Sequence, residues 1–139
     1  MASRILVIGA GRMGAIRAED LMAHVDQVLI ANRTAQRADD LAERLGAATV
    51  PFDAVLDERV DGYVLTTATA AHAGMFEQLI HTGRPILIEK PLALGLTDSR
   101  RMARLASSAL VNSRSPNGSN CSNCSTVRAL AIGVETVGC

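Results

Sequence analysis

The stretch RILVIGAGRMG, residues 4–14, decides the fold of this chain. Its apolar residues from Ile5 to Ile8 make a run of strand length that leads directly into a glycine-rich turn and then into a helical pattern. The order of strand, glycine turn and helix is typical of α/β proteins in which the turn approaches a nucleotide. We therefore expect residues 5–8 to form the first strand of a parallel sheet.

Each glycine of the G-x-G-x-x-G pattern has its own physical reason. Gly9 allows a tight turn, and Gly11 lets backbone N–H groups approach a pyrophosphate without a Cβ in the way. Gly14 lets the helix pack closely on the strand. The helix N-terminus, with Arg12 and Met13 in its first turn, carries unpaired N–H groups and partial positive charge that suit phosphates. The pattern predicts a dinucleotide site; the alternative is a glycine turn in another kind of α/β protein.

Length and composition set bounds on the class of protein. The chain has 139 residues, suited to one domain, and 48% apolar residues with only three aromatic side chains. An interior of Ala, Val, Leu, Ile and Met fits a parallel sheet flanked by helices. The net charge is zero, which argues against a nucleic-acid partner. No signal peptide or membrane span is apparent, and we expect a cytoplasmic protein with no membrane partner.

Strand-like and helix-like patterns alternate along the chain. We expect further strands at 27–31, 48–51, 61–67 and 85–89, and helices at 12–25, from the cap Thr34 to Leu45, at 70–82, and from the cap Thr97 with Met102, Leu105, Ala106 and Ala109 on one face. This alternation predicts an α/β fold with a doubly wound parallel sheet of the Rossmann type. Ligands in such sheets bind outside the carboxyl ends of the strands.

The residues after the second predicted strand bear on the choice of dinucleotide. Sites that take NAD usually carry an acidic residue about 20 positions after the glycines, where it binds the ribose 2′-hydroxyl. This chain has Asn32, Arg33 and Thr34 there. Arg33 can pair with a 2′-phosphate and its neighbours can donate hydrogen bonds, so NADP is favoured over NAD. The alternative is that Arg33 is a solvated loop charge or stacks on an adenine.

Polar residues also follow the fourth and fifth predicted strands. The fourth runs into Thr67 and Ala68, with His72 one helical turn beyond, and the fifth runs into Glu89 and Lys90. A lysine at this edge would lie near a nicotinamide, where it could act as a general acid or base or hold a ribose hydroxyl. Lysines at strand ends are also common surface residues, and His72 has a structural role at the start of its helix as an alternative.

Taken together, these residues resemble the N-terminal domain of the Gfo/Idh/MocA oxidoreductases, the family of glucose-fructose oxidoreductase and inositol 2-dehydrogenase. The resemblance runs from about Arg4 to Leu110, and its most specific element is Glu89-Lys90-Pro91 within GRPILIEKPL, residues 83–92. It implies NAD(P)-dependent hydride transfer to or from a sugar, cyclitol or related polyol. It also implies that Lys90 is the catalytic residue and that full-length members form oligomers. The cofactor-binding residues we expect are Gly9, Gly11, Arg12, Met13, Gly14, Asn32, Arg33, Thr34, Thr67, Ala68, His72, Glu89 and Lys90.

The chain departs from the family pattern in three ways. The family usually has Thr-Pro where this chain has Thr67-Ala68, and a frequent acidic residue is replaced by Asn32-Arg33, so both cofactors stay open. The family's second, mostly β domain, which supplies an Asp and a His to a proton relay, has no counterpart after Leu110. We therefore expect a dinucleotide-binding domain at residues 1–110 and an atypical tail at 111–139.

The tail changes composition abruptly. Residues 112–125 are mostly Ser, Asn and Cys, which cannot bury enough apolar area to fold alone, whereas residues 127–137 are apolar and could supply a sixth strand. We expect a truncated or frameshift-derived, poorly structured tail. Cys121 and Cys124 have C-x-x-C spacing, but only Cys139 remains as a further ligand, so we expect no metal site. The alternative functions are a non-catalytic NAD(P)-binding module and an inactive product of a disrupted gene.

Overall fold

A computed structural model describes residues 2–112 and 129–131 of the chain. Its strands are β1 (Arg4–Ile8), β2 (Gln27–Ala31), β3 (Ala48–Thr49), β4 (Gly62–Leu65), β5 (Ile86–Ile88) and β6 (Ala129–Ala131). Its α-helices are α1 (Arg12–Met22), α2 (Ala35–Leu45), α3 (Thr69–Leu79) and α4 (Leu96–Asn112), and its short 3-10 helices are η1 (Phe52–Ala54) and η2 (Ile80–Thr82).

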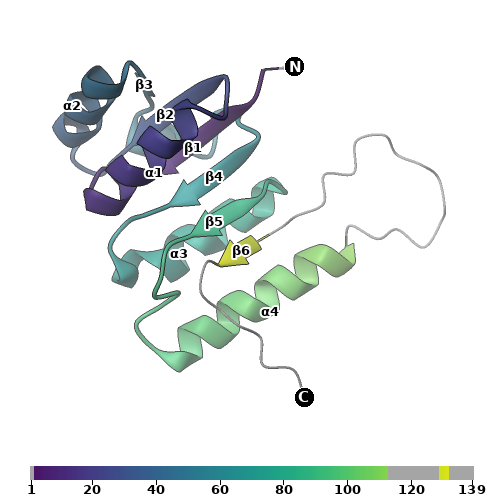
Figure 1. The fold of residues 1–139 in the computed structure, drawn as a ribbon. Helices are drawn as coiled ribbons and strands as arrows, with labels where there is room; N and C mark the ends of the chain where they lie inside the picture. The colour runs from purple at the N-terminus through teal and green to yellow at the C-terminus, as the bar shows by residue number, and fades with distance from the viewer. Residues whose placement is uncertain (1, 113–128, 132–139) are drawn as a thin grey trace, which may run out of the picture.

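The strands form one parallel sheet in the order β3-β2-β1-β4-β5-β6. This is the strand order of the Rossmann fold, and the order reverses between β1 and β4, where such folds bind their ligands. Figure 1 shows the layered arrangement, with the carboxyl end of β1 leading into α1. The predicted doubly wound parallel sheet is confirmed.

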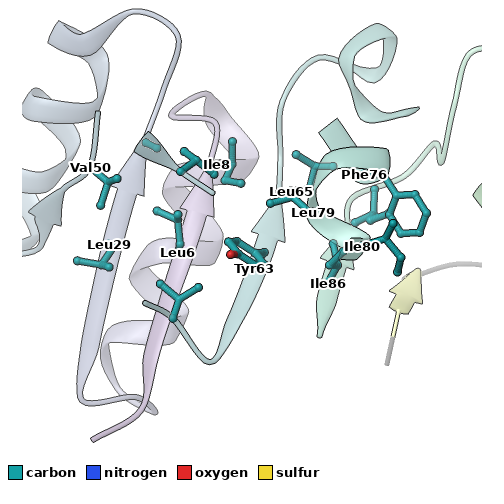
Figure 2. Close-up of a cluster of buried hydrophobic side chains, with 14 of the residues drawn as sticks. Leu6, Ile8, Leu29, Val50, Tyr63, Leu65, Phe76, Leu79, Ile80 and Ile86 are labelled. Carbon is teal, nitrogen blue, oxygen red and sulfur yellow. The ribbon is translucent and has the colours of Figure 1, made fainter. Parts of the chain in front are cut away.

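Two apolar cores lie on opposite faces of the sheet because successive strand residues point to opposite sides. On one face, side chains of the sheet such as Leu6 and Tyr63 pack against Phe76 of α3 and Met102 of α4. Figure 2 shows this cluster, with the ring of Tyr63 on β4 and that of Phe76 on α3. On the other face, Val7, Val28, Ile30 and Val64 pack against Ala18 of α1 and Ala38, Leu41 and Ala42 of α2. Burial on both faces explains why the strands read as unbroken apolar runs.

Several element boundaries differ from those expected. Helix α1 ends at Met22 rather than at residue 25, and β3 stops at Thr49, two residues before Pro51, which cannot donate to a strand ladder. Thr34 is the N-cap of α2 but makes no side-chain capping bond; its carbonyl oxygen instead accepts the N–H of Arg37 at 3.1 Å. Thr97 lies inside α4 rather than capping it, because the helix already begins at Leu96.

The expected face of α4 is confirmed: Met102 is buried, and Leu105, Ala106 and Ala109 pack against the first core. Residues 129–131 form β6, parallel to β5, which is the sixth strand that the sequence left open. The other predictions on the tail, including those on the cysteines, fall at 113–128 and 132–139, outside the described residues. Within the described part of the chain, no helix combines the length and the apolar character that crossing a membrane requires.

Candidate functional site

The three glycines of the turn after β1 have different surroundings. Gly9 has a φ of 113°, and an added Cβ would lie 2.7 Å from the backbone of Thr66. A Cβ at Gly14 would lie 1.9 Å from the carbonyl oxygen of Gly9. A Cβ added at Gly11, in contrast, would meet no heavy atom within 4 Å. The protein's own packing therefore requires Gly9 and Gly14, whereas the space beside Gly11 is open to an approaching ligand.

Two polar side chains hold this turn in place. The carboxamide of Asn32, just after β2, accepts the N–H of Ala10 at 3.0 Å and donates to the carbonyl oxygen of Thr34 at 3.0 Å. The hydroxyl of Thr66, just after β4, lies 3.0 Å from the carbonyl oxygen of Gly9 and donates there. The two neighbours of β1 thus fix the turn from both sides.

A cleft of about 290 Å³ opens at this carboxyl edge of the sheet. It is lined by Gly9, Gly11, Asn32, Arg33, Thr34, Arg37, Phe52, Thr66, Thr67, Ala68 and Ala71. The structure therefore brings together seven of the residues that the sequence singled out: Gly9, Gly11, Asn32, Arg33, Thr34, Thr67 and Ala68. These residues follow β1, β2 and β4, as the rule for ligands in parallel sheets requires.

Sequence reasoning missed four residues of the cleft lining: Thr66 and Ala71, which are sequence neighbours of predicted site residues, and Arg37 and Phe52, which are not. Arg37 is the third residue of α2, and its place one helical turn after Thr34 puts it back beside the cleft. Phe52 follows the short strand β3, so applying the strand-end rule to that strand could have found it. Both residues extend the cleft beyond the glycine turn, on the side of β2 and β3.

The electrostatics of the cleft favour an anion. Arg33 and Arg37 are both exposed, and among the described residues neither side chain takes part in a salt bridge or side-chain hydrogen bond. The hydroxyl of Thr67 is buried and has no hydrogen-bond partner within the same part of the chain. Free guanidinium groups, an open glycine and an unused hydroxyl in one cleft fit a phosphate-bearing nucleotide.

Arg12 and Met13 lie beside this cleft rather than in its lining. Arg12 begins α1 and lines an adjoining, more open groove of about 450 Å³ between α1 and α2, which also includes Gly11 and Arg37. Met13 is 39% exposed in the first turn of the same helix. Their side chains are therefore near the turn, and their contact with a cofactor stays a prediction.

Lys90 and Glu89 follow β5 at the same edge of the sheet. Glu89 is buried, and one of its carboxylate oxygens pairs with the Nε of Arg17 on α1. Lys90 is exposed, and within the described residues its amine makes neither a salt bridge nor a hydrogen bond. The charge of Glu89 is thus compensated by the helix that starts at the glycine turn, and the amine of Lys90 is available.

His72 has the surroundings of a structural residue. Its ring is 1% exposed, with Nε2 3.0 Å from the carbonyl oxygen of Thr67 and Nδ1 3.1 and 3.2 Å from the carbonyl oxygens of Pro91 and Leu92. The residue links the loop after β4 to the loop after β5, and it does not line the cleft. This is the structural alternative that the sequence left open, and direct contact with a cofactor stays a prediction.

Among the described residues, no group of three or more His, Cys, Asp or Glu side chains is placed to hold a metal ion. The chemistry available at this edge is that of backbone amides, arginines, hydroxyls and one lysine amine. Such a set suits the binding of a nucleotide and the transfer of a proton.

Comparison with known families agrees with this geometry. Residues 3–112 match the GFO_IDH_MocA family, described as "Oxidoreductase family, NAD-binding Rossmann fold". The chain belongs to the Gfo/Idh/MocA oxidoreductases. The matched range contains the glycine turn, the cleft and the segment of Lys90.

Individual relatives of this Gfo/Idh/MocA chain include inositol dehydrogenases. A scyllo-inositol 2-dehydrogenase (NAD(+)) of Bacillus subtilis is 30% identical over 103 residues, which cover 70% of this chain and 30% of that protein. The crystal structure of a myo-inositol dehydrogenase from Corynebacterium glutamicum superposes with a TM-score of 0.70 at 30% identity, covering 79% of this chain and 34% of that one. A glutamyl-tRNA reductase of Syntrophobacter fumaroxidans is 44% identical over 69 residues, covering 49% of this chain and 15% of that protein. The chain spans about a third or less of the length of each of these proteins.

Proposed function

We propose that this oxidoreductase chain binds NADP in preference to NAD, and that it serves hydride transfer to or from an alcohol carbon of a sugar, cyclitol or related polyol. The observation that carries the proposal is the cleft that joins the open side of Gly11 to Arg33 and Arg37, whose guanidinium groups form no salt bridge within the described part of the chain. The inositol dehydrogenases among the relatives support the substrate class.

The pyrophosphate is assigned to the backbone N–H groups at the start of α1. An α-helix leaves its first N–H groups without intrahelical partners, and no Cβ at Gly11 obstructs their approach. The adenine ribose then lies toward the loop after β2. There the 2′-phosphate would be bound by the guanidinium groups of Arg33 and Arg37, since both line the cleft and no carboxylate lines it.

Lys90 is the residue we assign to proton transfer. A bound nicotinamide would supply the hydride chemistry at the alcohol or carbonyl carbon. The hydroxyl proton has to leave as the carbon–oxygen double bond forms, and a neutral lysine amine is a suitable acceptor. In the reverse direction the protonated amine returns that proton to the oxygen. The place of Lys90 directly after Glu89 and β5, at the carboxyl edge of the sheet, supports this role.

The affinity of the chain for the two cofactors tests the first part of the proposal. Isothermal titration calorimetry with NADP⁺ and NAD⁺ should show tighter binding of NADP⁺. R33Q and R37Q should each weaken NADP⁺ binding about 10-fold and leave NAD⁺ binding nearly unchanged, because each removes one charged contact to the 2′-phosphate. R104Q is the matched control, since Arg104 is an exposed arginine of α4 outside the cleft. Equal affinity for both cofactors would refute the preference.

Turnover tests the second part. Incubation with NADP⁺ and a panel of sugars and cyclitols should produce reduced cofactor, and K90M should abolish that production. A second candidate function is an NADP-binding module without turnover. It is favoured by the lining of the cleft, which contains neither Lys90 nor any carboxylate or imidazole group. Tight NADP⁺ binding with no oxidation of any polyol would select this module.

A further inference from the structure

The main chain around Lys90 is held from both sides of the sheet, while its amine has no salt-bridge partner among the described residues. On one side, the buried carboxylate of Glu89 pairs with Arg17, and the N–H of Glu89 donates to the carbonyl oxygen of Leu65 at 3.0 Å. On the other side, Nδ1 of His72 lies within 3.2 Å of the carbonyl oxygens of the two residues that follow Lys90. The position of the Lys90 backbone is therefore set by residues that do not contact its amine.

The Arg17–Glu89 pair links two parts of the site that are 72 residues apart in the sequence. Arg17 belongs to α1, the helix whose N-terminus forms the glycine turn, and Glu89 directly precedes Lys90. The pair thus fixes the lysine segment relative to the helix that is assigned to the cofactor's pyrophosphate. The position of the lysine segment relative to α1 therefore depends on the Arg17–Glu89 contact.

The Arg17–Glu89 pair also explains why the carboxylate of Glu89 can be buried, because Arg17 supplies the opposite charge. The side chain of Glu89 is 7% exposed and that of Arg17 is 27% exposed. A buried carboxylate without a cation is strongly disfavoured, so loss of Arg17 would drive the Glu89 side chain toward water. Since Glu89 directly precedes Lys90, a displaced Glu89 would shift the backbone of Lys90 with it.

We infer that Arg17 is a positioning residue for Lys90, acting through Glu89; the kinetic part of this inference rests on the proposed function. Arg17 sets where the amine is placed relative to the cofactor without touching the reacting atoms. Its loss should therefore reduce kcat more than it weakens cofactor binding, because proton transfer depends on a placement finer than binding does.

The sequence offers a direct probe of this placement, because Lys90 is the only lysine of the chain. Reductive methylation with isotope-labelled formaldehyde would give NMR signals from Lys90 and from the N-terminal amine alone. We expect the Lys90 signal of the wild-type chain to differ from that of free methylated lysine and to shift when NADP⁺ is added. In R17M the signal should move toward that of free lysine, and its response to NADP⁺ should fall to about half or less.

Three further variants make the test specific. R17K, which restores a positive charge, should recover part of the wild-type signal, and E89Q should shift the signal as R17M does. R101M is the matched control, because it breaks the Arg101–Glu77 ion pair between α4 and α3, which involves neither Glu89 nor Lys90. In R17M, kcat for an oxidised polyol should fall about 10-fold while the affinity for NADP⁺ changes less than about 2-fold.

The outcomes separate this inference from the proposed function. A Lys90 signal that R17M and E89Q leave unchanged would overturn the positioning role, even if NADP⁺ binds. Failure of the wild-type chain to bind NADP⁺ would overturn the proposed function, yet the signal of the cofactor-free protein would still test the positioning role. If R17M unfolds, the double variant R17M/E89Q removes both charges at once, and a wild-type Lys90 signal in it would likewise refute the inference.

Discussion

Gly11 and Gly14 occur in one short pattern, but the structure predicts opposite consequences for replacing them with alanine. Gly11 is the N-cap of α1 with φ −81° and ψ −165°, an extended conformation that alanine adopts without strain. Its Cβ would meet nothing within 4 Å. The Cβ of alanine at position 14 would lie 1.9 Å from the carbonyl oxygen of Gly9 and 2.9 Å from Oγ1 of Thr66.

The expected magnitudes follow from these surroundings. Alanine is a poorer N-cap than glycine by about 0.5–1 kcal/mol, and this loss is offset by about 0.4–1 kcal/mol from the less flexible unfolded chain. G11A should therefore change the free energy of unfolding by less than about 0.5 kcal/mol. G14A forces α1 away from the turn and should cost about 3 kcal/mol or more, which lowers the Tm by about 10 °C or more.

The affinity for NADP⁺ should respond to G11A even though the stability does not. The methyl group of G11A would occupy the space in which we place the pyrophosphate and would disrupt one hydrogen bond to a charged group, worth about 1.5–3 kcal/mol. NADP⁺ affinity should thus fall about 10-fold to 100-fold in a protein that is still fully folded.

Thermal unfolding followed by circular dichroism is the suitable stability assay, because the chain has no tryptophan, and calorimetry measures the affinity. The reasoning is refuted if G11A binds NADP⁺ as tightly as the wild-type chain. It is also refuted if G11A loses as much stability as G14A, because the space beside Gly11 would then be filled by the protein itself.

Three other predictions test the residues around the cleft and the core. H72A should destabilise the chain by about 3 kcal/mol in urea unfolding, since it leaves a cavity and removes the hydrogen bonding of a buried ring to the loops after β4 and β5; a loss below about 1 kcal/mol would contradict the structural role of His72. Burial raises the pKa of Tyr63 above its ordinary value of 10.0, so the folded state keeps the phenol protonated where the unfolded chain releases the proton. The stability that the protonated phenol of Tyr63 contributes should accordingly be fully present below about pH 10 and be lost as the pH rises above that value. Urea titrations of Y63F should show a smaller fall in the free energy of unfolding over this pH range, and an equal fall in Y63F would exclude Tyr63 as the cause. K90M should leave NADP⁺ affinity within about 3-fold of the wild-type value and lower polyol oxidation about 100-fold or more, and retained oxidation would remove Lys90 from proton transfer.

The fold could be predicted from the sequence because the patterns that define each helix and strand lie within that element. The apolar runs, the glycine at the end of α2 and the periodic face of α4 each lie within one element, and together they imply alternating strands and helices. The errors are at the ends of helices and strands. The predicted helix over 12–25 stops at Met22, and the chain then turns toward β2. In this turn the N–H of Asp26 donates to the hydroxyl of Ser3 at 3.1 Å. That bond joins residues 23 positions apart, and no local pattern contains it.

The contacts that build the site are equally non-local. The pairing of Arg17 with Glu89 requires α1 to lie against the end of β5, which depends on the strand order β1-β4-β5. The carbonyl groups around His72 come from two different loops. A single sequence predicts that such residues gather at one edge of the sheet, but which of them pair there is determined by register and packing.

Asn32 is a residue whose predicted role at the cofactor changes once its hydrogen bonds are known. By sequence it is a donor to a bound dinucleotide, yet its carboxamide already accepts the N–H of Ala10 and donates to the carbonyl oxygen of Thr34. It therefore stabilises the turn, and an amide in that position does not by itself discriminate between NAD and NADP. The proposed preference for NADP rests instead on charge: Arg33, which the loop sequence indicates, and Arg37, which reaches the same cleft because α2 begins directly after Thr34.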